Sequence, residues 1–257
     1  MEEKTKSKIE LADSILEVVE QLDRIIENAR SHNSRLGFFA ALYREVTIQI
    51  QEGIATNFFE DGERMERLDV IFANRYLQAL RDFQNGQPPT RSWRLAFEAG
   101  ASWRPLILQH LLLGINAHIN LDLGIAAAQT SPGDALASLK SDFYKINDIL
   151  SALLEVVQDK ISALSPALNL LDKVGGRSDE AIMNFSIQKA RDEAWKFAQQ
   201  LAPFNEEEQE THIQQKDERI VALGKIVRSP VWVINLFTFI IRIFETSKVS
   251  KIINVLF

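Results

Sequence analysis

Cysteine is absent from the sequence of 257 residues. Its absence excludes disulfide bonds, thiolate nucleophiles and cysteine-based zinc sites, so any metal site would depend on histidine and carboxylate ligands. Glycine and proline are also scarce, at 11 and 7 residues, which argues against a fold built from many tight hairpins. Leucine, alanine, glutamate, glutamine and isoleucine are abundant and favour helices. The sequence therefore predicts an all-α protein.

Positive charge is in deficit, because the formal net charge is −6. The chain has no lysine- and arginine-rich block with interleaved aromatic residues, so nucleic acid is not an expected partner. The first residues are charged and do not form the basic-then-apolar pattern of an export signal. Together with the lack of cysteine, this pattern is compatible with a reducing compartment, and we expect a cytoplasmic protein.

Long apolar runs are few. The stretch "VWVINLFTFIIRIF" near the C-terminus contains Asn235 and Arg242 and is well short of the roughly 20 apolar residues that a membrane span needs. We therefore expect no transmembrane segment. Burial of this stretch in the core is favoured, but its aromatic side chains could also give peripheral membrane contact. These side chains are Trp232, Phe237 and Phe239.

Apolar residues recur every three or four positions along most of the chain, which predicts a series of amphipathic helices. We expect a single domain over residues 1–257, a bundle of about eight helices around a buried central helix at about 105–127. A peripheral helix is expected within residues 1–35, and the charged stretch 203–218 is expected to be a solvated helix, a connector or a lid. The expected helices cover residues 8–30, 36–54, 61–84, 91–103, 105–127, 134–164, 178–201, 212–227 and 230–245, with a glycine-rich hinge at 173–180 and a short helix at the C-terminus.

The central stretch "LILQHLLLGINAHINLDLGIAA" is apolar on nearly every side but carries several polar residues. On an α-helix, side chains four residues apart lie about 40° apart around the axis, so His118 and Asp122 share one face. This pair could ligate a divalent metal such as zinc or iron, or could act as an oriented general acid or base. His110 lies about 12 Å further along the axis and could line the same groove without reaching the same ion.

The amides of the central helix lie on the opposite side from His118. Asn116 and Asn120 form a stripe with Gln109, and buried amides usually bond to neighbouring helices because an unpaired one costs about 1–3 kcal/mol. A structural role is therefore the favoured interpretation of these amides, with substrate binding as the alternative. Gly114 precedes His118 by one turn and opens room either for a ligand or for a closely packed helix.

Further residues of a site would have to come from other helices. The chain has no G-x-S-x-G, glycine-rich phosphate loop, dinucleotide fingerprint or H-E-x-x-H motif, which excludes the standard hydrolase, kinase and Rossmann interpretations. Polar side chains that converge on His118 would complete a site, whereas each alone is more simply a surface charge or an ion pair. The expected substrate-binding residues are Tyr43, Asp69, Tyr76, Asn116, Asn120, Arg191 and Trp195.

Four segments resemble, in order and spacing, a bacterial family known as domain of unknown function 5995. They are "FFAALYREVTIQI", "FFEDGERMERLDVIFANRYLQAL", "LILQHLLLGINAHINLDLGIA" and "ARDEAWKFAQQL", and the likeness spans residues 36–245. The third contains the N-A-H-I-N-x-D-L signature of that family. The resemblance implies a single all-helical domain but no ligand or reaction. It also implies that His110, Asn116, His118, Asn120 and Asp122 match the family's central motif, and that Asp61, Asp69, Tyr76, Arg191 and Trp195 match its secondary positions.

Two hypotheses from different classes follow. In the first, the protein is an enzyme whose apolar pocket holds a small or lipid-like molecule against His118, Asp122 and His110. It would be either a metal-dependent hydrolase with a bound water as nucleophile or a metal-free acid–base cyclase, isomerase or lyase. In the second, the protein binds an apolar ligand or a partner helix without catalysis, and the polar stripe is structural. The hydrogen bonding of His118 and Asp122 distinguishes the two hypotheses.

Overall fold

All regular structure in the described part of the chain is helical, which confirms the all-α prediction. The computed structural model describes residues 9–165, 187–229, 238–239 and 241–257. Its elements are α1 Ile15–Ser31, α2 Gly37–Ala55, α3 Gly62–Gln84, α4 Arg91–Gly100, α5 Ile107–Ala117, a π turn His118–Asp122, α6 Leu123–Thr130, a short 3₁₀ turn Gly133–Ala135, α7 Leu136–Leu164, α10 Ile187–Leu201, α11 Glu206–Arg228 and α13 Val249–Leu256.

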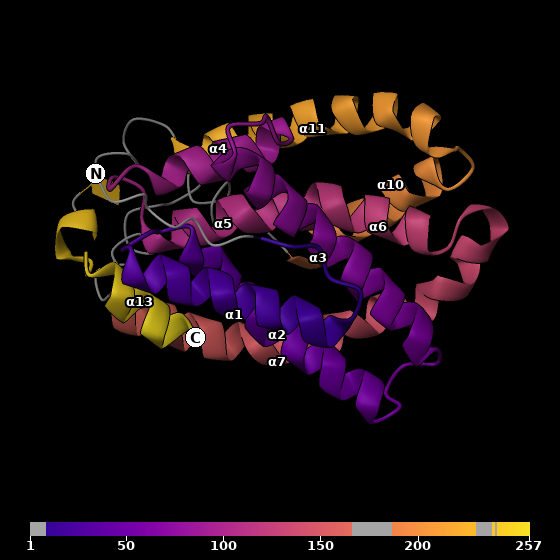
Figure 1. The fold of residues 1–257 in the computed structure, drawn as a ribbon, viewed down its shortest axis with the longest axis horizontal. Helices are drawn as coiled ribbons and strands as arrows, with labels where there is room; N and C mark the ends of the chain where they lie inside the picture. Colours follow the sequence, from indigo (N-terminus) through magenta and orange to yellow (C-terminus); the bar gives the residue numbers. More distant parts are fainter. Residues whose placement is uncertain (1–8, 166–186, 230–237, 240) are drawn as a thin grey trace.

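The central helix of the prediction corresponds to α5, the π turn and α6, which run through the middle of the bundle (Figure 1). The other helices pack around this axis, and α3 crosses it while α11 lies along one edge (Figure 1). Among the described residues, Ile107–Thr130 is the one stretch long and apolar enough to cross a membrane, and 89% of its apolar window is buried inside the fold. This burial is typical of the core helix of a bundle.

Helix α1 packs its apolar face on the core, and the part of the expected peripheral helix at residues 1–8 lies outside the described residues. Val18 and Leu22 have no exposed surface, and α1 packs against α2, α3 and α13. The segment before α1 is also fixed, because the Asn74 side chain donates to the backbone oxygen of Ala12 and accepts from its nitrogen, both at 2.8 Å. The apolar stripe that predicted this helix therefore faces the core.

The charged stretch 203–218 belongs largely to α11 and is not a connector or lid. Helix α11 begins at Glu206 because Asn205 and Glu208 form a capping box that pairs both their backbone nitrogens. One of its carboxylates has a structural role, since Asp217 accepts from the backbone nitrogens of Arg91 (2.7 Å) and Ser92 (3.0 Å) at the start of α4. This bond fixes α11 to α4.

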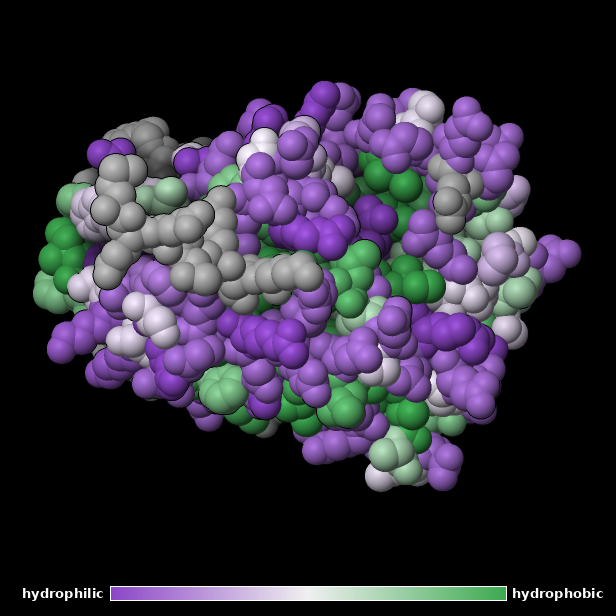
Figure 2. Space-filling model, viewed as in Figure 1, coloured by the Kyte–Doolittle hydropathy of each residue, from purple (hydrophilic) through white to green (hydrophobic). Residues whose placement is uncertain are grey.

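Several sequence-based expectations fall partly outside the described residues. These are the hinge at 173–180, the beginning of the helix expected at 178–201, and most of the aromatic stretch 230–245 with Trp232 and Phe237. On the face shown in Figure 2 hydrophilic residues predominate, and apolar residues gather in separate patches. Peripheral membrane contact through the aromatic stretch stays a prediction.

Candidate functional site

The backbone departs from a regular α-helix at His118 and Asp122, the two residues predicted to be catalytic or metal-binding. His118–Asp122 forms a single π turn between α5 and α6, so the prediction of one continuous α-helix over 105–127 is wrong at this point. Such turns are rare, because their wider hydrogen-bonding pattern packs the backbone less well, and they occur frequently at functional sites. Here the turn places the side chains of His118 and Asp122 in the interior.

Asp122 is an ionised carboxylate with both oxygens paired. Its Oδ1 accepts from Arg75 Nε at 2.8 Å, and its Oδ2 accepts from Trp93 Nε1 at 2.7 Å. Burial by itself raises the pKa of Asp122, but the positive charge of Arg75 and the hydrogen bonds from His118 and Trp93 outweigh it, so the pKa lies below its usual value.

The charge on Asp122 determines the tautomer of His118. His118 Nδ1 lies 3.5 Å from Asp122 Oδ2, and an ionised carboxylate can only accept a hydrogen bond. We therefore assign the ring proton to Nδ1, which leaves Nε2 with a free lone pair. Burial lowers the pKa of His118 more than the Asp122 charge raises it, so the imidazole is neutral at neutral pH.

Five aromatic rings surround this imidazole and are called here the aromatic cage. Phe72 stacks on the His118 ring with centroids 3.5 Å apart and an angle of 8°, and the edge-on ring of Tyr43 follows at 4.5 Å. The other members come from α2, α3 and α4, so three helices enclose one side chain of the central axis. They are Phe39 at 5.5 Å, Trp93 at 5.8 Å and Tyr76 at 6.3 Å from the imidazole centroid.

Gly114 serves the packing of the cage. A Cβ atom added at Gly114 would lie 2.5 Å from Cδ2 of Phe39, which is closer than any real contact of this kind. The space beside this glycine is therefore filled by the phenyl ring of Phe39, which in turn contacts His118. Of the two interpretations of Gly114, the structure supports close packing.

Several polar atoms in and beside the cage are buried without a hydrogen-bond partner in the described structure. They are His118 Nε2, both carboxylate oxygens of Asp69, and the hydroxyls of Tyr43 and Tyr76. The Thr47 hydroxyl beside Tyr43 donates to the backbone oxygen of Tyr43 at 3.0 Å, and its effect on the Tyr43 phenol is to lower the pKa that burial raises. Leaving such groups unpaired costs about 1–3 kcal/mol each, and more for a charged group.

The unpaired groups have shifted acidities because of their burial. Burial, with a smaller contribution from the negative charge of Glu66, raises the pKa of Asp69 to about 7. The pKa of Tyr43 is raised by burial and then by the charge of Asp69, and burial alone raises the pKa of Tyr76. Near pH 7 Asp69 can therefore either hold or release a proton, whereas both tyrosines are neutral hydrogen-bond donors.

Comparison with known proteins identifies the family. The family of unknown function DUF5995 matches residues 15–230, which is most of the chain. The chain belongs to the DUF5995 family. No curated protein and no solved structure matched it. The predicted resemblance is thus confirmed, and the function of this DUF5995 protein has to be inferred from its site.

His110 does not join the cage in this DUF5995 chain. It lies two turns before His118, and its ring packs against Phe38 with centroids 5.7 Å apart. Burial, together with the charges of three arginines, lowers its pKa to about 3. The three are Arg35, Arg242 and Arg228. His110 is therefore a neutral core residue at physiological pH.

The amide stripe attaches the central helix to α11. Asn116 Nδ2 donates to the backbone oxygen of Ile220 at 3.0 Å, and Asn120 Nδ2 donates to Asn116 Oδ1 at 3.0 Å. Gln109 Nε2 donates to the backbone oxygen of Val227 at 2.7 Å. These bonds agree with the structural interpretation of the stripe and leave Asn116 and Asn120 away from the cage.

Arg191 and Trp195 lie in a different part of the DUF5995 fold, where α10 packs on α7. Arg191 donates to Asn147 Oδ1 at 2.6 Å and to the backbone oxygen of Phe143. The Trp195 ring contacts that of Phe143 at 4.9 Å. Burial lowers the pKa of Arg191 to about 9. The structure thus places Tyr43 and Tyr76 beside His118 and leaves Arg191 and Trp195 apart from it. Asp69 is close enough to Tyr43 for its charge to act on the phenol.

The donor set does not fit a zinc or iron ion. Among the described residues no three histidine, cysteine, aspartate or glutamate side chains are grouped to hold a metal. Both oxygens of Asp122 already accept N–H groups, and the nitrogen of His118 that faces Asp122 carries a proton by the tautomer assigned above. The free lone pair of His118 Nε2 would be a single ligand, whereas structural or catalytic sites use three or more protein ligands.

Proposed function

We propose that this DUF5995 protein is a metal-independent acid–base enzyme that acts on a small, largely apolar molecule held at the aromatic cage. One observation carries the proposal. His118 is a neutral imidazole with Nδ1 directed to an ionised Asp122 and with Nε2 buried and unpaired. A positioned base with a free lone pair is what proton abstraction requires.

The surrounding groups have complementary roles in such a reaction. His118 Nε2 takes a proton from the substrate, and the charge of Asp122 stabilises the imidazolium that forms. The hydroxyls of Tyr43 and Tyr76 donate hydrogen bonds to an oxygen on which negative charge develops. Return of the proton at another position gives an isomerisation or cyclisation, whereas loss of a leaving group gives an elimination.

The non-catalytic alternative is less well supported. It requires the polar groups near His118 to be paired inside the core, as the amides of Asn116 and Asn120 are. The unpaired atoms of His118, Asp69 and Tyr76 do not meet this requirement. Single unpaired atoms occur elsewhere in the described core, as at His110 Nε2, but several such atoms gathered around one side chain are what a ligand or reaction would use.

Deuterium incorporation from heavy water tests the proposed chemistry without a known substrate. The wild-type protein and the His118→Asn variant are incubated in D₂O with a small-molecule extract of cells, and mass spectra are compared. We expect at least one compound to gain deuterium or change composition with the wild type. The rate should fall by about 10²-fold to 10⁴-fold in the variant, because asparagine can still donate to Asp122 but lacks the base.

Two further variants control this experiment. His32→Asn changes an exposed histidine and should behave as the wild type. Tyr76→Phe removes only an unpaired hydroxyl, so the fold should be retained while the rate falls by about 10²-fold. If no compound differs between the wild type and His118→Asn when both are folded by circular dichroism, the protein does not have this activity.

A further inference from the structure

The unpaired groups at the cage contain more hydrogen-bond acceptors than donors. His118 Nε2 contributes one lone pair, and the carboxylate of Asp69 contributes two oxygens. The available donors are the hydroxyls of Tyr43 and Tyr76, and each hydroxyl is also an acceptor. A molecule that satisfies this set must therefore bring several donors of its own.

Asp69 also has no positively charged side chain paired with it among the described residues. It is 2% exposed, and neither of its oxygens has a hydrogen-bond partner. On α3 it precedes Phe72 by one turn and Tyr76 by two, and its charge acts on the Tyr43 phenol. A buried carboxylate beside aromatic rings is a combination that binds positively charged groups, because ring faces attract cations and the carboxylate neutralises them.

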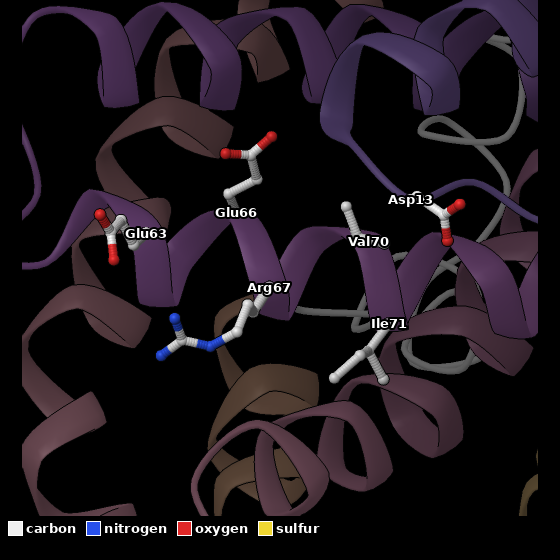
Figure 3. Close-up of a pocket in the computed structure, with 6 residues that line it drawn as sticks. All are labelled: Asp13, Glu63, Glu66, Arg67, Val70 and Ile71. Atoms are coloured by element: carbon white, nitrogen blue, oxygen red, sulfur yellow. The ribbon is translucent and has the colours of Figure 1, made fainter.

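The outer side of α3 carries an open groove that is negatively charged, as Asp69 is when ionised. Figure 3 shows this groove, which has a volume of about 360 Å³ and lies between α3 and the segment that precedes α1. Three carboxylates and one guanidinium line it, together with Val70 and Ile71. The charged residues are Asp13, Glu63, Glu66 and Arg67. Glu66 precedes Asp69 by one turn, and its charge acts on Asp69.

We infer that the molecule bound at the aromatic cage is an organic ammonium ion with an apolar body, whose N–H groups pair with Asp69 and whose carbon atoms contact the rings. The inference rests on the proposed function, because it names the substrate class of the same site. The acidic groove would raise the local concentration of such a cation next to α3. The N–H donors of a primary ammonium match the excess of acceptors at the site.

Binding of matched charged and neutral probes tests this inference. The probes are n-butylammonium against n-butanol, and benzylammonium against benzyl alcohol, at millimolar concentrations. NMR signals of the Trp93 indole N–H and of the His118 ring report on binding. We expect the ammonium probe of at least one pair to bind about tenfold or more tightly than its alcohol, because hydrogen bonds to a charged group are stronger than neutral ones.

Two variants locate the bound cation. Asp69→Asn should abolish the preference for the ammonium probe, whereas Glu218→Gln, which removes an exposed carboxylate on α11 that does not line the groove, should retain it. Equal or tighter binding of the alcohols, or no shift of either signal with any probe, would overturn the ammonium inference. Neither result would affect the acid–base activity itself, which the deuterium experiment with His118→Asn decides separately.

Discussion

Replacement of Asp69 by asparagine is expected to stabilise the ligand-free protein at and above neutral pH. Burial raises the pKa of Asp69 from 3.8 to about 7. Between these two pH values Asp69 is protonated in the folded state but ionised in the unfolded state. The free energy of unfolding is therefore unaffected by the burial of the Asp69 charge below about pH 4, and it falls as the pH rises to about 7. At 1.36 kcal/mol per pKa unit, the loss approaches about 4 kcal/mol.

Urea unfolding at several pH values between 4 and 8 measures this effect. The free energy of unfolding of the wild type should fall through this range relative to that of Asp69→Asn, and the variant should be the more stable protein at pH 8. Glu63→Gln provides the control, because Glu63 is exposed and its replacement should shift stability by no more than about 0.5 kcal/mol. A less stable Asp69→Asn protein at pH 8 would mean that the carboxylate is paired and structural.

Replacement of Asp122 by alanine is expected to have the opposite effect, a loss of about 3–5 kcal/mol. The change leaves the Arg75 guanidinium and the Trp93 indole N–H without their shared acceptor in the core. The unpaired charge of Arg75, whose side chain is 22% exposed, is expected to be the largest part of this cost. Loss of stability here does not argue against catalysis, because the same carboxylate orients His118 and binds two helices to the central axis.

Thermal or urea unfolding measures this loss, with Glu218→Ala as the matched control. Glu218 pairs with Arg91 at 2.8 Å, but both side chains are about 60% exposed, and such pairs contribute about 1 kcal/mol or less. A loss below about 1 kcal/mol for Asp122→Ala would contradict the assigned hydrogen bonds. The two buried aspartates of this site are therefore predicted to differ in the sign of their contribution.

Much of the fold follows from local sequence patterns. Apolar residues at three- and four-residue steps predicted α2 and α3 to within one residue at either end, and Asp61, where the predicted range begins, is the N-cap of α3. The face shared by His118 and Asp122 also follows from helix geometry alone, and the structure places the two side chains 3.5 Å apart. These features depend on residues that are near one another in the chain.

The partners of the site depend on contacts that no local pattern encodes. Trp93 bonds to Asp122 from another helix, 29 residues away in sequence, and Arg75 does so from 47 residues away. Apolar spacing equally well describes an α-helix and a π turn, so the wider turn at His118–Asp122 could not be predicted. The charged residues of α11 indicated solvent exposure, but one of them, Asp217, is buried because its side chain caps the start of α4.

The protonation of the His118 ring tests the central claim most directly. Long-range ¹H–¹⁵N correlation spectra of the wild-type protein, assigned with His118→Asn, distinguish the two ring nitrogens between pH 5 and 8. The structure predicts a neutral ring at pH 7 and above, with the proton on Nδ1 and a free lone pair on Nε2, because burial lowers the pKa of His118 below its usual value. A proton on Nε2, or a charged imidazolium at pH 7, would leave no base at the cage and would contradict the proposed function.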